Sequence, residues 1–143
     1  MESATMGRVL TEATVENLND LWDARRGLIP PDQVRRIHVT GALVDTGATT
    51  LALPTCLIRQ LGLNKSYEKP GRSSKGTGPV SVFDTVRLTI MDRTCTVEVM
   101  EVPDEIPVLI GQIPLEMLDL VVNPRECRLI GNPAHGGEHI LEI

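Results

Sequence analysis

Aromatic residues are almost absent from this chain of 143 residues, which contains one Trp, one Tyr and one Phe. The core must therefore be built from Val, Leu and Ile, and no aromatic platform exists for stacking nucleic-acid bases. The net charge is −5, and the basic residues are scattered along the chain. This charge pattern argues against nucleic acid and anionic membranes as partners.

Long apolar runs are also absent, so no segment approaches the length of a membrane span. Residues 1–6 are not followed by the apolar segment of a secretory signal peptide. The three cysteines, Cys56, Cys95 and Cys127, are an odd number without close spacing. We therefore expect a cytoplasmic protein whose thiols are reduced, buried in apolar surroundings and unreactive.

The chain has the length of a single domain, and it contains no repeat and no long linker. We expect residues 1–6 to be disordered and residues 7–33 to form an N-terminal extension that contains a strand. Residues 34–143 then form the main domain. Asp84 interrupts the apolar face of an alternating segment. We expect it to be a structural acid that is bonded to a partner.

Short alternating apolar segments predict a mostly β protein, an all-β barrel or sandwich. The expected strands cover residues 8–17, 34–44, 51–53, 80–90, 95–99, 108–110, 120–122 and 127–130. Two short helices are expected, one from Pro54 to a C-terminal cap at Gly62 and one over residues 114–118. Residues 70–79 are rich in Gly and Pro, which predicts irregular structure, either a mobile loop or a hairpin tip.

An acid, Asp45, follows the apolar residues Leu43 and Val44 at the end of an expected strand. Gly47 would allow backbone N–H groups to approach this carboxylate, and the Thr46 hydroxyl could hold the loop from behind. Such a loop suits a carboxylate held rigidly for acid–base chemistry. Asp-Thr-Gly is also a common turn, in which the acid caps a backbone N–H. The tripeptide by itself leaves both roles open.

Four features occur together in one order along residues 34–131. They are an active-site loop (Asp45, Thr46, Gly47, Ala48), a Gly-rich tip (Ser73, Ser74, Lys75, Gly76, Thr77, Gly78), an apolar pair with a glycine (Leu109, Ile110, Gly111), and the short helix 114–118 before a terminal β segment. In this the sequence resembles the retroviral-type aspartic peptidases, the retropepsins and their cellular relatives.

The resemblance implies a retropepsin-like closed barrel with a flap hairpin and one or two short helices, formed by residues 34–143. It implies an aspartic endopeptidase without a cofactor or metal, acting on peptides or proteins. Two carboxylates activate a water in this family, and the chain has one Asp-Thr-Gly. A homodimer that pairs two copies of Asp45 follows. The resemblance makes 73–78 the flap and makes Leu109, Ile110 and Gly111 the residues that brace the catalytic loop.

The sequence also departs from the viral pattern. Gln112 stands where many relatives carry a charged residue, and residues 120–143 add a hairpin and a tail. The segment 7–33 could replace part of a dimer interface or cover the cleft as a pro-segment would. A second reading is a retropepsin-fold binding or dimerisation module with little activity. His135 and His139 match an inverted zinc-peptidase signature, but adjacent glycines disfavour the helix that it needs.

Overall fold

The structure, a computed structural model, describes residues 8–73 and 75–143. Residues 1–6, which were expected to be disordered, and the flap residue Ser74 lie outside the described residues. The strands are β1 (Leu10–Asn17), β2 (Arg36–Val44), β3 (Leu51–Pro54), β4 (Lys65–Ser73), β5 (Gly76–Ile90), β6 (Arg93–Val102), β7 (Leu109–Ile110), β8 (Leu120–Asn123) and β9 (Arg128–Gly131). The helices are α2 (Leu18–Arg25), α3 (Thr55–Leu61) and α4 (Gln112–Met117), with 3-10 turns η1 (Pro31–Gln33) and η2 (Pro133–His135).

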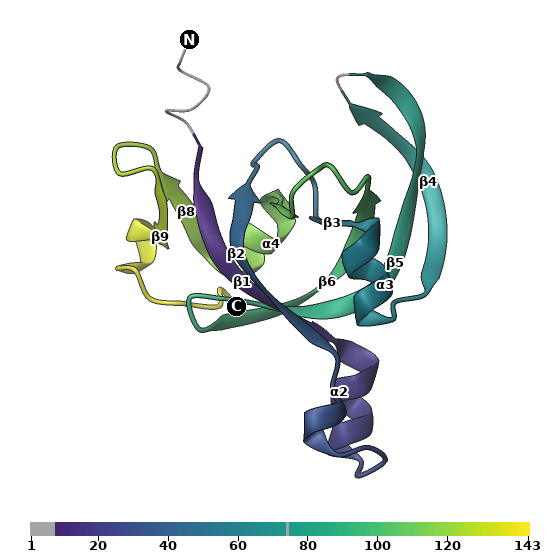
Figure 1. The fold of residues 1–143 in the computed structure, drawn as a ribbon. Helices are drawn as coiled ribbons and strands as arrows, with labels where there is room; N and C mark the ends of the chain where they lie inside the picture. Colours follow the sequence, from purple (N-terminus) through teal and green to yellow (C-terminus); the bar gives the residue numbers. More distant parts are fainter. Residues whose placement is uncertain (1–7, 74) are drawn as a thin grey trace.

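Seven strands form one sheet in the order β1-β2-β7-β3-β6-β5-β4, and β1 also pairs with β5. This additional pairing bends the sheet into a ring, from which the β4–β5 hairpin projects (Figure 1). The strands β8 and β9 form a separate antiparallel pair. The all-β, retropepsin-like fold expected from the sequence is confirmed.

The interior of the ring is aliphatic, as the shortage of aromatic residues predicts. Its largest fully buried side chains come from five strands, two helices and the residue that follows α4: Leu51, Leu53, Ile58, Leu61, Leu88, Ile90, Ile110, Leu118, Val15, Val86, Val99 and Pro114. Burial of each Leu, Ile or Val side chain contributes about 1.5–3 kcal/mol to stability. Val15 of β1 belongs to this set, so the N-terminal segment is part of the same core.

Helix α3 is built as the sequence predicts. Pro54 occupies the N-cap position, and Gly62 ends the helix in the left-handed conformation, with φ of 69°. The second predicted helix begins slightly earlier than expected, because α4 spans Gln112–Met117. In both helices, the buried side chains face the ring: Ile58 and Leu61 from α3, Pro114 and Leu115 from α4.

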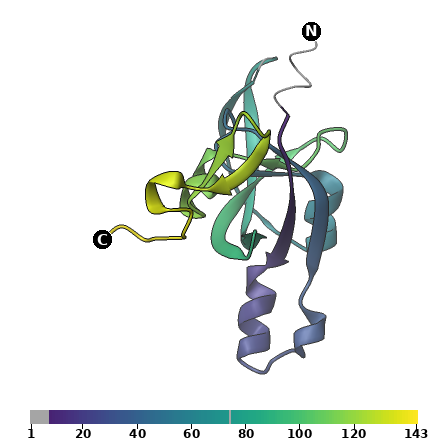
Figure 2. The same ribbon diagram turned by 90° about the vertical axis from the view of Figure 1, so that its left-hand side faces the viewer.

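Helix α2 was not predicted. It extends with η1 away from the sheet as a helical arm (Figure 1, Figure 2). The Asn17 side chain caps it by accepting a hydrogen bond from the Asp20 amide at 3.0 Å. Asp20 is buried and accepts three hydrogen bonds from Arg35, two from the guanidinium and one from the backbone amide. The pair ties α2 to the residue before β2.

The expectation of irregular structure at 70–79 was wrong in part. These residues form the hairpin tip, but β4 and β5 continue to Ser73 and from Gly76, and Pro70 lies opposite Pro79. The hairpin extends beyond β6 here, so each strand has a neighbour on one side only. A proline lacking its N–H is tolerated at such an edge. The glycine at position 71 also suits the paired hairpin, because the Val80 side chain occupies the space where a Cβ on Gly71 would lie.

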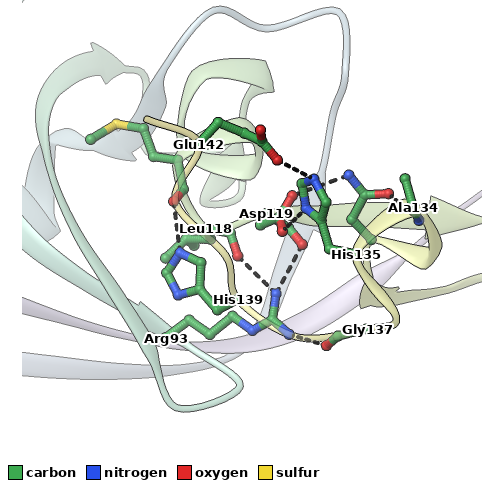
Figure 3. Close-up of polar contacts among 10 residues, drawn as sticks. Arg93, Leu118, Asp119, Ala134, His135, Gly137, His139 and Glu142 are labelled. Atoms are coloured by element: carbon green, nitrogen blue, oxygen red, sulfur yellow. Dashed lines mark hydrogen bonds and ion pairs between the residues drawn. The ribbon is translucent and has the colours of Figure 1, made fainter.

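The C-terminal segment is attached to the region between α4 and β8 by a polar network (Figure 3). His135 lies between two carboxylates, with Nδ1 2.5 Å from Asp119 Oδ2 and Nε2 3.0 Å from Glu142 Oε2. Arg93, at the β5–β6 turn, donates hydrogen bonds to the carbonyl oxygens of Leu118, Asp119 and Gly137. These contacts hold residues 132–142 against the end of α4.

The cysteines differ from the expectation of three buried thiols. Cys56 and Cys127 are exposed, and only Cys95 is partly buried. Burial raises the pKa of the Cys95 thiol to about 11, so this thiol is protonated at neutral pH. Cys56 is exposed because it lies in the first turn of α3, on the side opposite the buried Ile58.

Candidate active site

Asp45 lies directly after β2, at the point where the chain leaves the sheet. Its amide donates a hydrogen bond of 2.9 Å to the carbonyl oxygen of Ile110, so the β2–β7 pairing continues to the acid itself. The Gly47 amide donates to the Asp45 carboxylate oxygen Oδ1 at 3.0 Å, and the Ala48 amide donates to the Asp45 carbonyl oxygen at 3.0 Å. The loop therefore fixes the carboxylate from its own backbone.

A second segment braces this loop from behind. The Gly111 amide donates to the Thr50 carbonyl oxygen at 3.0 Å, and the Gln112 amide donates to the Ala48 carbonyl oxygen at 2.9 Å. The Ile113 amide adds a third bond, to the Thr49 carbonyl oxygen at 2.9 Å. All three donors belong to the turn from β7 into α4. Leu109 and Ile110 place this turn by pairing with β2 and β3.

Gly111 is required by the closeness of this contact. A Cβ atom on this residue would lie 2.4 Å from the Thr50 oxygen and 2.7 Å from the Ala48 oxygen. Backbone atoms cannot move aside as a flexible side chain can, so a larger residue would displace the loop that carries Asp45. The resemblance implied a bracing role for Leu109, Ile110 and Gly111, and in the structure these residues lie beside the active-site loop, with the Gly111 amide bonded to Thr50.

The Asp45 loop opens into a cleft of about 820 Å³. The β4–β5 hairpin covers one side of it, and the active-site loop, β6, β7 and α4 line the rest. The apolar lining includes Val80, Val82, Met100, Leu109, Ile113 and Met117. A cleft of this size between a hairpin and a strand-rich floor can accommodate an extended peptide.

The predicted site residues are distributed as follows. Asp45, Gly47 and Ala48 line the cleft, and Thr46 is exposed beside them. Of the described flap residues, Ser73, Gly76 and Gly78 line the cleft, whereas the lining does not include Lys75 or Thr77. The structure therefore brings the active-site loop and the hairpin tip to one cavity, although about 30 residues separate them in the chain.

Asp84 is a structural acid, as expected. Its Oδ2 accepts a hydrogen bond from the Asn64 amide at 2.9 Å, and its own amide donates to the Asn64 carbonyl oxygen at 3.0 Å. It lies at an irregularity in the β5–β6 pairing, between Phe83 and Val86. This local bulge explains why an acid interrupts the apolar alternation of β5.

His135 and His139 do not share a helical face. His135 ends η2, a three-residue turn, and His139 Nε2 lies 3.2 Å from the Met117 carbonyl oxygen. Within residues 8–73 and 75–143, no group of three or more His, Cys, Asp or Glu side chains is arranged to hold a metal ion. The zinc-peptidase signature is therefore not formed in the described structure.

The polar residues of the cleft that were not singled out from the sequence include Tyr67, Lys69 and Glu98. The Tyr67 hydroxyl donates a hydrogen bond of 2.6 Å to Glu98 Oε1, and the Lys69 ammonium lies 5.3 Å from the centre of the Tyr67 ring. The bond to the carboxylate raises the pKa of Tyr67 above its usual value. Tyr67 and Glu98 are 31 residues apart, so no local pattern could have paired them.

The model of one protein family, described as aspartyl protease, matches residues 36–131. The match includes the Asp45 loop, the hairpin over the cleft and the bracing segment at 109–111. No curated protein sequence matches the chain significantly. In the described part of the chain, no helix is both long and apolar enough to cross a membrane. Because the family model matches about two thirds of the residues, the chain belongs to the retropepsin-like aspartyl protease family.

Proposed function

We propose that this protein is an aspartic endopeptidase that acts as a homodimer, in which two Asp45 carboxylates activate a water that attacks a peptide bond. One observation supports this proposal most strongly. The Asp45 carboxylate lines a cleft of peptide size and is fixed by the amide of Gly47 at 3.0 Å. Three backbone bonds from the β7–α4 turn brace its loop. Such rigidity is what a general base requires.

The proposed chemistry needs a second carboxylate. Two acids that face each other share one proton, because both cannot ionise cheaply at close range. One accepts a proton from the water while the other donates a proton to the carbonyl oxygen of the substrate. The electrons of the water oxygen form the new bond to carbon, and the peptide nitrogen leaves after it is protonated.

The second carboxylate comes from another copy of the chain. Among the described residues two other acids line the cleft, but Glu98 accepts a hydrogen bond from Tyr67 and Glu101 accepts one from the Thr55 hydroxyl at 2.8 Å. Both lie on β6 and neither has a second Asp-Thr-Gly loop around it. A two-fold axis beside the active-site loop supplies an identical acid with an identical bracing segment. Thr46, which is exposed in the single chain, would then contact its counterpart.

In this proposal the N-terminal segment, residues 7–33, is a structural part of the peptidase domain. β1 pairs with β2 along one side and with β5 along the other, and its Ala13 and Val15 are buried. Removing it would open the ring and expose the core. This arrangement favours a structural role for the segment over that of a pro-segment covering the cleft.

Cleavage of a diverse peptide mixture tests the proposed activity. Wild-type protein and the Asp45→Asn variant are incubated from about pH 4 to pH 7, the range over which paired carboxylates titrate. Products are identified by mass spectrometry, and circular dichroism checks that both proteins are folded. The proposal expects cleavage by the wild type alone. Cleavage by both proteins would place the chemistry elsewhere, and cleavage by neither would favour a binding module.

A further inference from the structure

Glu98 occupies a distinctive position among the acids of the cleft. Its carbonyl oxygen accepts a hydrogen bond of 3.0 Å from the Thr50 hydroxyl, at the end of the active-site loop. The same Thr50 is held from the other side by the Gly111 amide. The backbone of Glu98 is therefore anchored to the segment that fixes Asp45, and its carboxylate lies on a rigid wall of the same cleft.

The orientation of this carboxylate is set by Tyr67. The hydroxyl of Tyr67 donates to Oε1 at 2.6 Å, a short bond of the kind that a charged acceptor makes. The bond runs from β4 of the hairpin to β6, across the intervening β5. This bond occupies Oε1 and fixes the orientation of the carboxylate. The other carboxylate oxygen of Glu98, Oε2, can still accept hydrogen bonds.

Glu98 has no cation beside it among residues 8–73 and 75–143. None of the ion pairs in that part of the structure includes Glu98. Two basic residues of the hairpin, Lys69 and Arg72, line the same cleft, and the Lys69 ammonium lies 5.3 Å from the centre of the Tyr67 ring. Glu101, by comparison, is already bonded to Thr55.

The surroundings of Glu98 suit a long basic side chain. Val82 of β5 pairs with Met100 of β6, and Tyr67 of β4 pairs with Val82, so these three residues form an apolar row across the cleft wall. Lysine and arginine bury their methylene stems against such surfaces while the charged group seeks an acceptor. Glu98 lies two residues before Met100, on the same face of β6.

We propose that Glu98 is a specificity-determining residue, whose carboxylate binds a lysine or arginine side chain of the substrate at a position flanking the cleaved bond. The inference rests on the proposed peptidase function. Tyr67 acts as its positioning residue, because it holds the carboxylate in the orientation that a guanidinium or ammonium group meets. The apolar residues that line the cleft accept the side chains at the bond itself.

A matched set of peptides tests this assignment. The peptides have equal length and carry Lys, Ala or Glu in turn at each flanking position. The ratio of kcat/KM for Lys peptides to that for Ala peptides is measured for wild type, Glu98→Gln and Glu98→Lys. A hydrogen bond to a charged group predicts a ratio about tenfold lower in Glu98→Gln. Glu98→Lys should prefer the Glu peptides. Glu12→Gln, which removes an acid on β1 outside the cleft, is the control.

A binding measurement separates this inference from the proposed function. Fluorescein-labelled peptides of the same set are titrated with Asp45→Asn, with and without Glu98→Gln, and Kd is read from fluorescence polarisation. Weaker binding of Lys peptides alone in the double variant supports the role of Glu98, even if no peptide is cleaved. Three results would overturn the inference while the peptidase function stands. They are cleavage without preference for Lys peptides, a preference for Glu peptides, and a Lys preference that Glu98→Gln leaves unchanged.

Discussion

Gly111 and Thr50 lie so close together that the amide of one donates to the carbonyl oxygen of the other at 3.0 Å, with no room for a side chain between them. This contact joins the β7–α4 turn to the end of the active-site loop. The Thr50 hydroxyl extends the connection to Glu98 on β6. The geometry of Asp45 therefore depends on residues far from it in sequence.

Replacing Gly111 with alanine should destabilise the protein and abolish activity, because the new Cβ would lie 2.4 Å from the Thr50 oxygen. Overpacking against backbone costs about 1–3 kcal/mol. Urea unfolding measures the loss, with Gly41→Ala as the matched control, since a Cβ on Gly41 would meet no atom of residues 8–73 and 75–143 within 4 Å. Equal stability of the two variants would contradict the bracing role of Gly111.

Replacing Asp20 with alanine should destabilise the attachment of the helical arm. The substitution leaves the Arg35 amide without its acceptor and removes two bonds from the Arg35 guanidinium. A lost partner of this kind costs about 1–3 kcal/mol, and the Arg35 side chain is half exposed, which reduces the part due to charge. Hydrogen exchange of α2 amides should accelerate. Unchanged exchange in α2 would show that Asp20 does not hold the arm.

The His135 and Asp119 pair should make stability depend on pH. The hydrogen bond to Asp119 raises the pKa of His135, and Glu142 adds to this effect. The stabilisation from His135 is therefore complete below its unfolded pKa of about 6.5 and is lost as pH rises through the folded value. The bond to His135 lowers the pKa of Asp119, so that contribution is lost as pH falls below about 4.

Urea midpoints at pH 5.5 and pH 8.5 measure this effect, at values chosen to bracket the usual histidine range. The wild type should lose more stability between these pH values than His135→Asn. His38→Asn is the control, because His38 pairs with Glu12 at an exposed site. A wild-type pH dependence retained in His135→Asn would assign the titration to another group.

Most strands and the active-site loop could be predicted because their signals are local, whereas β4, Lys65–Ser73, was not among the expected strands. Alternation locates β5, Pro54 and Gly62 delimit α3, and the Asp-Thr-Gly sequence marks the loop after β2. Helix α2 was missed although Leu18, Leu21 and Trp22 have the i, i+3, i+4 spacing of a helix, because the segment has only 8 residues and its pattern is short. Its signal was present in the cap, since Asn17 is followed three residues later by Asp20. A search for caps as well as periodicity would have found it.

The remaining features depend on contacts between distant segments. Prolines near the hairpin tip suggested irregular structure, but an exposed two-stranded hairpin tolerates Pro70 opposite Pro79. The bond between Tyr67 and Glu98 joins β4 to β6 and has no local signature. The bracing role of Gly111 came from the resemblance to a family, and its physical cause, the approach of two backbones, is visible only in the structure.

The pairing of two Asp45 residues is the central claim, and a mixing experiment tests it most directly. Wild type and Asp45→Asn are refolded together at equal concentrations so that subunits exchange, and peptide cleavage is measured per wild-type chain. If each active site needs Asp45 from both copies, random pairing halves this activity to about 50% of that of wild type alone. Activity per wild-type chain that stays unchanged on mixing would contradict the shared site and make the single chain the active unit.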